Sequence, residues 1–336
     1  MVLQKSVLEG DRLALARLLT EIENDSPAGR KALNALFKHT GKAYLIGVTG
    51  APGTGKSTLV NQLALHYRKT APSRVAIVAV DPTSPFTGGA VLGDRIRMRE
   101  LSGDTGVFIR SMATRGSLGG LAAATASVAQ VLDAAGYELI FVETVGAGQS
   151  EVEIAKLAHT TLVVEAPGLG DDVQAIKAGI LEIADILVLN KADRPGVEAA
   201  ERALLGMLKL GHPVVRSLGH HGRTEKSGAA EADLAAKDEW IPPIRRTVAT
   251  EGKGVAELAE TIAAHRAHLE KTGGWQRRER ARLQNELEAL LQDRLVSGWR
   301  KKVGNKEYRH MLDKLLAREI SPHQAVKTLL DGNLRK

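Results

Sequence analysis

Short runs of apolar residues alternate with longer amphipathic stretches along the middle of this chain. The runs read AYLIGVT, VAIVAV, GVFIRS, ELIFVE, TTLVVE and DILVLN, and a shorter run, IRRTVA, follows near residue 245. They are apolar throughout instead of alternating with polar residues, which is typical of parallel strands covered by helices on both faces. The pattern predicts an α/β fold with a mainly parallel sheet flanked by helices.

The two ends of the chain follow a helical period instead. Near the N-terminus apolar residues recur at helical spacing in two groups: Leu15, Leu18, Leu19, Ile22 and then Leu33, Leu36, Phe37. After Gly273 a stripe of leucines has the same period: Leu283, Leu287, Leu290, Leu291 and Leu295. A last helix is predicted to begin at Ser321, because Ser321 can cap it, Pro322 presets its first turn and Gln324 can close a capping box.

These patterns divide the chain into three predicted parts. Residues 1–41 form a helical N-terminal extension, residues 42–268 the sheet domain, and residues 269–336 a helical C-terminal arm for dimerisation or interaction. Within the sheet domain, residues 219–240 are polar and rich in glycine, alanine and charge. They are therefore expected to form a long peripheral connection.

Composition places this chain among ordinary globular proteins. Of its 336 residues 43% are hydrophobic and 25% are charged, which excludes collagen-like, disordered and disulfide-scaffold classes. The absence of cysteine excludes thiolate metal sites and suits a reducing compartment, so we expect a cytoplasmic protein. Residues 116–132 carry no charge but consist largely of small residues, and the N-terminus carries early charges, so neither a membrane span nor a signal peptide is expected.

The net charge of +7 is confined to one part of the chain. Residues 273–336 hold 15 basic and 8 acidic residues, an excess equal to the whole net charge. The rest of the chain is balanced, so a uniformly basic nucleic-acid-binding domain is not expected. The aromatic residues of the tail, Trp275, Trp299 and Tyr308, are too sparse for a base-stacking surface. We expect an amphipathic arm whose basic side chains lie along its surface.

The strongest chemical signal is the sequence GAPGTGKS between the run YLIGVT and the helical stretch TLVNQLALHY. It fits GxxxxGK[ST], in which glycines let successive backbone N–H groups face a phosphate. In this motif Lys56 brings positive charge to the β- and γ-phosphates, and the Ser57 hydroxyl can ligate Mg²⁺. The predicted nucleotide-binding residues of the loop are Gly50, Ala51, Pro52, Gly53, Thr54, Gly55, Lys56, Ser57 and Thr58.

A second motif, Asn190-Lys191-Ala192-Asp193, indicates which base is bound. It follows the predicted strand DILVLN, about 135 residues after the phosphate loop. Guanine offers two adjacent N–H donors that the carboxylate of Asp193 can accept together, whereas adenine presents an acceptor at N1. The sequence therefore favours GTP and GDP over ATP, and the residues after the last predicted strand are expected to wrap the guanine with backbone groups: Ala249, Thr250 and Glu251.

Carboxylates at the ends of two other predicted strands complete the expected site. Asp81 follows VAIVAV, and Glu143 opens Glu-Thr-Val-Gly, which resembles the DxxG of GTPases with glutamate substituted. Polar residues at the carboxyl ends of parallel strands meet in one crevice. Gly146 would offer its N–H to the γ-phosphate, and Asp94 is a further candidate carboxylate. The predicted catalytic residues are Lys56, Asp81, Asp94, Glu143 and Gly146, and the predicted Mg²⁺ ligands are Ser57, Asp81, Asp94 and Glu143.

The residue after Gly146 is Ala147, where many GTPases have a catalytic glutamine. Gln149 lies nearby and is a weaker candidate for positioning water. Slow intrinsic hydrolysis is the expected consequence.

Taken together, the motifs resemble those of the MeaB/ArgK family of GTPases, chaperones of adenosylcobalamin-dependent methylmalonyl-CoA mutase. The resemblance spans about residues 40–330 and is carried by VTGAPGTGKSTL, DPTSPFTGGAVLGDRIRM, FIRSMATRGSLGG, FVETVGAGQSE, GDDVQAIKAGILEIADILVLNKAD and the tetrapeptide WIPP. It implies a P-loop NTPase fold and a homodimeric, Mg²⁺-dependent GTPase. Such a protein would dock on an acyl-CoA mutase, methylmalonyl-CoA mutase foremost, and gate the loading and protection of its cofactor.

The resemblance also implies a switch loop between Pro167 and Lys177, with a signalling role for Lys177. The switch residues would be Asp171, Asp172, Gln174 and Lys177. The charged residues of this loop could equally form a solvated helix end. The loop also has Leu169 at a position where many relatives have a polar residue.

Two alternatives stay open at the level of sequence. A metallochaperone-like GTPase would need a ligand cluster, and the chain offers only His220 and His221 side by side. An ATPase of amino-acid transport is the other label attached to the family, and the guanine-type motif argues against it.

Overall fold

The computed structural model describes residues 2–71, 73–82, 98–101, 103–114, 118–144, 149–168, 182–210 and 240–331. Seven strands form one sheet: β1 (Tyr44–Thr49), β2 (Val75–Pro82), β3 (Val107–Thr114), β4 (Leu139–Thr144), β5 (Thr160–Glu165), β6 (Ile186–Asn190) and β7 (Ile244–Thr247). They coincide with the apolar runs and with IRRTVA, so the strand prediction is confirmed.

The strand order is β3-β2-β4-β1-β5-β6-β7, and every pairing between these strands is parallel. β1 lies between β4 and β5 at the centre of the sheet, and its residues are all buried. Its carboxyl end, where the phosphate loop begins, is therefore flanked by the ends of β4 and β5. This arrangement confirms the predicted α/β class.

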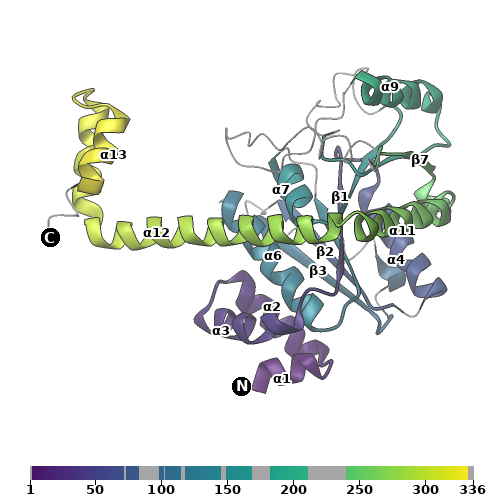
Figure 1. The fold of residues 1–336 in the computed structure, drawn as a ribbon, viewed down its shortest axis with the longest axis horizontal. Coiled ribbons are helices and arrows are strands. Elements are labelled where there is room, and N and C mark those ends of the chain that lie inside the picture. Colours follow the sequence, from purple (N-terminus) through teal and green to yellow (C-terminus); the bar gives the residue numbers. More distant parts are fainter. Residues whose placement is uncertain are drawn as a thin grey trace. The chain divides into compact units, whose positions relative to one another are not determined.

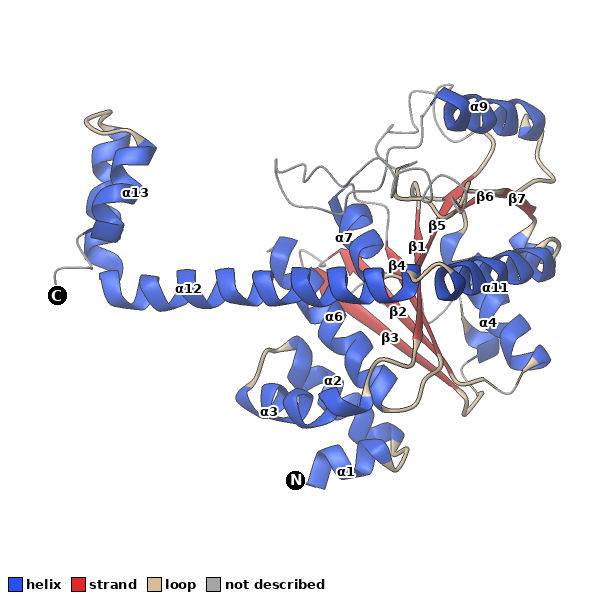
Figure 2. Cartoon of the chain, viewed as in Figure 1, coloured by secondary structure: helices blue, strands red, loops and turns tan. Residues whose placement is uncertain are grey.

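Helices cover both faces of the sheet (Figures 1 and 2). One face packs against α4 (Lys56–Thr70) and α11 (Val255–Lys271), which share a core with alternate residues of β1 such as Ile46 and Val48. The other face packs against α6 (Leu118–Ala134) and α7 (Gln149–Leu157), and α9 (Val197–Leu210) covers β6. Short 3-10 turns complete this part: η1 (Phe37–His39), η2 (Arg99–Leu101) and η4 (Ala249–Glu251).

The N-terminal extension consists of α1 (Val2–Leu8), α2 (Arg12–Glu23) and α3 (Pro27–Leu36), packed against α6. Asp11 caps α2 by accepting from two backbone N–H groups, and Ser26 caps α3 just before Pro27. Asp133 of α6 accepts hydrogen bonds from the backbone N–H groups of residues 41–43. That carboxylate therefore fixes the point at which the chain passes from the extension into β1.

Two compact units make up the chain, residues 1–282 and 283–336. The helix α12 (Gly274–Leu316) begins in the first unit, where its first turns contact the sheet through Trp275 and Arg278. The first unit thus extends to Arg282. Ring and ion-pair contacts, which helical periodicity does not reveal, hold the first turns of α12 to it.

The second unit holds the rest of α12 and α13 (Pro322–Asp331). Its helices meet where Nε1 of Trp299 donates to the carbonyl oxygen of Leu329 at 3.3 Å, and the predicted cap forms between Ser321 and Gln324. Gly304 has φ 74° and ψ 159°, so α12 is kinked there. None of the helices within the described ranges is long and apolar enough to cross a membrane.

Candidate functional site

The phosphate loop joins β1 to α4, and two of its glycines pass very close to neighbouring strands. Gly50 and Gly55 have φ 135° and 95°. A Cβ atom on Gly50 would lie 2.1 Å from the carbonyl oxygen of Val164, and one on Gly55 would lie 2.4 Å from Nδ2 of Asn190. Only glycine therefore lets the loop lie against the ends of β5 and β6.

Lys56 and Ser57 open α4 and are both nearly buried. The Lys56 ammonium donates to the carbonyl oxygens of Gly50 at 2.9 Å and Ala51 at 3.0 Å, which holds it within the loop. The Ser57 hydroxyl donates to Oε1 of Glu143 at 2.5 Å. Glu143 lies near the carboxyl end of β4, opposite Val48 of β1. The structure thus brings together a lysine, a hydroxyl and a carboxylate that separate motifs predicted.

Asn190 lies at the end of β6 and joins three segments around the predicted base site. Its Nδ2 donates to the carbonyl oxygen of Thr54 at 2.8 Å. Its Oδ1 accepts from the Thr247 hydroxyl at 3.0 Å and from the Ala249 N–H at 3.1 Å. The side chain is 1% exposed. Asn190 therefore ties the phosphate loop to β7 and to η4, a role that the motif alone did not reveal.

Beside Asn190, the side chain of Lys191 crosses the phosphate loop and donates to the carbonyl oxygen of Gly53 at 2.6 Å. Asp193 is exposed, and Glu251 forms an ion pair with Lys253 at 2.6 Å. The hydrogen bond to Glu251, together with the negative charge of Glu251 and to a lesser degree that of Asp193, raises the pKa of Lys253. A small pocket opens between these segments and is lined by Gly55, Thr58, Asn190, Lys191, Val248, Ala249 and Thr250. Both predicted base-binding segments thus border one cavity.

Several predicted residues cannot be placed in the same way. Asp81 lies near the end of β2, next to Ala113 of β3, but only its backbone is described. Gln149 begins α7, and again only the backbone is described. The following lie outside the described residues: Asp94, Gly146, Ala147, Asp171, Asp172, Gln174, Lys177, His220 and His221. Within the described residues no three His, Asp or Glu side chains form a metal-binding cluster.

One acidic residue at this edge was not among the predicted site residues. Glu165 ends β5, directly after Val164, whose carbonyl lies against Gly50. Burial and the negative charge of Glu151 raise its pKa to about 7, while the positive charge of Lys56 acts in the opposite direction. Glu165 could have been identified from the sequence as a charged residue at the carboxyl end of an apolar run, the same pattern that identified Asp81 and Glu143.

This arrangement defines a class of protein. A glycine-rich loop with its lysine and serine, a carboxylate from β4 and the guanine-type motif at the end of β6 all lie at the carboxyl edge of a parallel sheet. That combination is typical of GTP-binding P-loop proteins.

Comparison with known proteins identifies the family. The profile described as "Methylmalonyl Co-A mutase-associated GTPase MeaB" matches residues 15–304. A Pyrococcus abyssi protein named as a GTPase is 45% identical over 322 residues, covering 96% of this chain and 93% of the relative. GTPase ArgK of Escherichia coli is 33% identical, covering 84% of this chain and 80% of the relative. The chain belongs to the MeaB family and is a GTPase.

Two further matches are more distant. A Caenorhabditis elegans protein named methylmalonic aciduria type A homolog, mitochondrial, is 27% identical, covering 97% of this chain and 81% of the relative. The crystal structure of LAO/AO transport system kinase has a TM-score of 0.69 at 24% identity, covering 98% of this chain and 95% of that one. The structural likeness supports the fold.

Proposed function

We propose that this GTPase docks on an adenosylcobalamin-dependent acyl-CoA mutase, most specifically methylmalonyl-CoA mutase, and gates the loading and protection of its cofactor. The observation that carries the proposal is the extent of the family match. It runs from the N-terminal helices through the sheet into α12, so it covers more than the nucleotide-binding domain. Within this proposal, bound GTP orders loops that relax after hydrolysis and thereby alter a partner interface.

The proposed roles of the site residues follow from their chemistry. Backbone N–H groups of residues 50–58 bind the phosphates, Lys56 neutralises charge on the β- and γ-phosphates, and Asn190, Lys191 and Asp193 select guanine. Gly146 would contact the γ-phosphate, and the backbone of residues 249–251 would border the base. The proposed switch residues remain Asp171, Asp172, Gln174 and Lys177.

Magnesium is the proposed metal, and the described donors fit it. The Ser57 hydroxyl and the Glu143 carboxylate are both nearly buried and 2.5 Å apart, and oxygen atoms of this kind are the ligands that Mg²⁺ prefers. Asp81 and Asp94 would supply further carboxylates. When bound, Mg²⁺ would neutralise charge developing on the phosphates, while Lys56 and the loop hold them in position.

We also propose that the chain is a homodimer and that the second unit supplies the interface. Leu287, Leu291 and Leu295 of α12 are exposed and lie on one side of the helix. Contiguous exposed apolar residues of this kind are typical of interaction sites.

Two measurements test the proposed function. First, purified protein should prefer GDP to ADP, and Lys56→Ala should bind neither; normal GTP affinity in this variant would refute the assignment of the phosphate site. Second, single-turnover GTP hydrolysis should be slow alone and should change when methylmalonyl-CoA mutase is added. The same assay with an isobutyryl-type mutase distinguishes the partner, and no response to either enzyme would refute docking.

A further inference from the structure

Thr49 and Thr144 form a buried hydroxyl pair at the carboxyl edge of the sheet, where β1 and β4 end. Their Oγ1 atoms are 3.1 Å apart, and the two residues are 0% and 1% exposed. Thr49 directly precedes Gly50, the first residue of the phosphate loop, and Thr144 directly follows Glu143. The hydroxyl pair therefore joins the strand that leads into the phosphate loop to the strand that carries the carboxylate beside Ser57.

Backbone pairing between β1 and β4 stops one residue before this pair. The last paired residues are Val48 and Glu143, and the chain then turns into the phosphate loop at Gly50, which has φ 135°. On its other side Thr144 is still paired with Val80 of β2. The side-chain hydrogen bond therefore extends the attachment of β4 to β1 one residue beyond the backbone ladder, to the edge where the phosphate loop begins.

The end of β4 is held from both faces of the sheet. Successive side chains of a strand point to opposite faces. On the face covered by α4, Glu143 accepts the hydrogen bond from Ser57 at the start of that helix. Thr144 points to the other face, as does Val142, which belongs to the core formed with α6 and α7. Two hydrogen bonds on opposite faces thus fix Glu143 relative to the phosphate loop.

Packing alone does not call for hydroxyl groups at this place. The neighbours of the pair in the same row of the sheet are apolar and buried: Val80 of β2 beside Thr144, and Val163 of β5 beside Thr49. Valine has nearly the shape of threonine, and burying a hydroxyl is unfavourable unless it forms a hydrogen bond. The hydroxyl pair therefore adds a directional link at a position where the core itself needs only shape.

We propose that Thr49 and Thr144 are positioning residues for GTP hydrolysis, because their hydrogen bond holds the end of β4 against the phosphate loop and so keeps the Glu143 carboxylate in place beside Ser57. They act through Glu143. This inference rests on the proposed assignment of Ser57 and Glu143 to Mg²⁺. Misplacing a group by about 1 Å can slow a reaction on the order of a hundredfold, whereas the backbone of the phosphate loop keeps its own contacts with GDP.

Valine substitutions separate positioning from stability. Each single variant, Thr49→Val or Thr144→Val, leaves one buried hydroxyl without its partner and should lower the thermal unfolding midpoint by a few degrees. The double variant removes both hydroxyls, so its midpoint should return to within about 2 °C of the wild-type value. Hydrolysis should not return with it. In single turnover at saturating GTP and Mg²⁺ the double variant should be about 10–100-fold slower, while its affinity for GDP without Mg²⁺ changes less than about threefold.

A second measurement does not depend on activity. Mg²⁺ titrated into the GDP complex should bind the double variant about tenfold more weakly than the wild-type protein, because the support of a metal-binding carboxylate is lost. Thr144→Ser keeps a hydroxyl at this position, so its hydrolysis rate and its affinity for Mg²⁺ should both stay within about threefold of the wild-type values.

Thr160→Val is the matched control at the opposite edge of the same sheet. Thr160 begins β5, is 0% exposed, and its hydroxyl lies 2.7 Å from Nδ1 of His265. This variant should be less stable than the wild-type protein but should hydrolyse GTP at the wild-type rate.

The outcomes distinguish this inference from the proposed metal site. A wild-type rate in the double variant, or an equal loss of rate in Thr160→Val, would show that the hydroxyl pair serves stability alone and would overturn the proposal. Unchanged Mg²⁺ affinity in the double variant would overturn it too, because the pair would then not act through Glu143. If Glu143→Gln also binds Mg²⁺ as tightly as the wild-type protein, the metal assignment itself fails.

Discussion

At the scale of single residues, Asn190 shows how a recognition residue can also hold its site together. Its amide makes hydrogen bonds to Thr54 of the phosphate loop and to Thr247 and Ala249 after β6, without any nucleotide. The phosphate loop and the predicted guanine loop are therefore joined through one buried side chain. The neighbouring residue of the same motif, Asp193, is exposed and has no comparable structural role.

This contrast gives a matched pair of variants. Asn190→Ala should lower the free energy of unfolding by about 2–4 kcal/mol without nucleotide, because a buried hydroxyl, an N–H and a carbonyl lose their partner. Asp193→Asn should change it by less than about 0.5 kcal/mol, as expected for a surface position, yet lose preference for GDP over xanthosine diphosphate. Urea denaturation and nucleotide titration measure the two effects. Equal stability of both variants would contradict the structural role of Asn190.

The functional residues could be predicted from the sequence where they belong to a motif. They were harder to predict where their role depends on tertiary contacts. Ser57 and Glu143 were assigned to one site from sequence because carboxyl ends of parallel strands converge, and the structure places them 2.5 Å apart. Glu165 has the same position on β5 but stood outside the prediction. Its significance depends on burial and on Glu151, which becomes a neighbour only through the fold.

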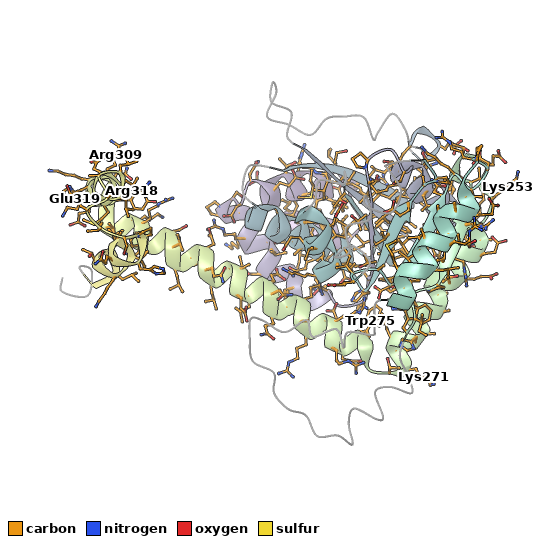
Figure 3. All side chains as sticks on the ribbon, turned by 90° about the horizontal axis from the view of Figure 1, so that it is seen from above. Lys253, Lys271, Trp275, Arg309, Arg318 and Glu319 are labelled. Atoms are coloured by element: carbon orange, nitrogen blue, oxygen red, sulfur yellow. The ribbon has the colours of Figure 1, made fainter. Side chains whose placement is uncertain are left out.

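At the scale of elements, the junction of α11 and α12 is held against the amino ends of the central strands. Figure 3 labels Lys271 and Trp275 at this turn. The indole of Trp275 stacks on His159 with ring centroids 4.0 Å apart. Arg278 makes two hydrogen bonds of 2.8 Å to Asp185, which is 1% exposed. The helical period does not reveal these contacts, whereas strand positions followed directly from apolar runs.

The ion pair between Arg278 and Asp185 is expected to matter for stability. Arg278→Ala should lower the free energy of unfolding by about 3–5 kcal/mol, because a buried carboxylate loses its two charge-assisted hydrogen bonds to the guanidinium. Arg277→Ala is the control, since Arg277 is exposed and its guanidinium donates to the carbonyl oxygen of Thr272 at the helix end. That control should stay within about 0.5 kcal/mol of the wild-type protein in urea denaturation. A loss below 1 kcal/mol for Arg278→Ala would show that the junction is held by ring packing alone.

His159 makes the same junction sensitive to acid. Its Nδ1 accepts from the Leu45 N–H at 3.0 Å, so that nitrogen must be unprotonated, and Nε2 lies 2.6 Å from Glu279. Burial lowers the pKa of His159, although Glu279 acts in the opposite direction. The unfolded chain therefore binds the proton first as pH falls below 6.5. The contribution of neutral His159 to the free energy of unfolding is fully present above pH 6.5 and is lost as the pH falls further.

The expected loss has a slope of at most about 1.4 kcal/mol per pH unit. His159→Asn, which keeps an acceptor but cannot titrate, should remove this slope between pH 7 and pH 5. His323→Asn is the control, because His323 is exposed, and it should keep the wild-type slope. The pKa of Glu279 is lowered to about 2, so its contribution to stability is lost only below about pH 4.5, which is outside this window. Chemical denaturation at each pH measures the slopes, and parallel slopes for His159→Asn and the wild-type protein would contradict the argument.

At the scale of the whole molecule, the two units differ in what they expose. The second unit, residues 283–336, holds 11 basic and 7 acidic residues and the most exposed leucines of α12. The nucleotide site lies entirely within the first unit. Nucleotide binding and self-association should therefore be separable by substitution. The uneven charge along the sequence already indicated a separate C-terminal arm, but it did not show which helical residues are exposed.

Replacing the leucine stripe tests that separation. Leu287, Leu291 and Leu295 are 58%, 50% and 70% exposed. Burying each in a dimer would contribute about 1.5–3 kcal/mol, so Leu287→Glu, Leu291→Glu and Leu295→Glu together should weaken dimerisation at least about a thousandfold. A matched triple, Asn285→Glu, Ala289→Glu and Gln292→Glu, adds the same charge on the opposite side of the helix and should remain dimeric.

Sedimentation equilibrium at micromolar concentration distinguishes the two triples by mass, and GDP titration should give wild-type affinity for both. A wild-type protein that is monomeric at tens of micromolar would refute the homodimer. Dissociation of both triples alike would show that added charge, not the apolar stripe, disrupts the contact. Lost GDP affinity in the leucine variant alone would mean that self-association and the nucleotide site are coupled across the two units.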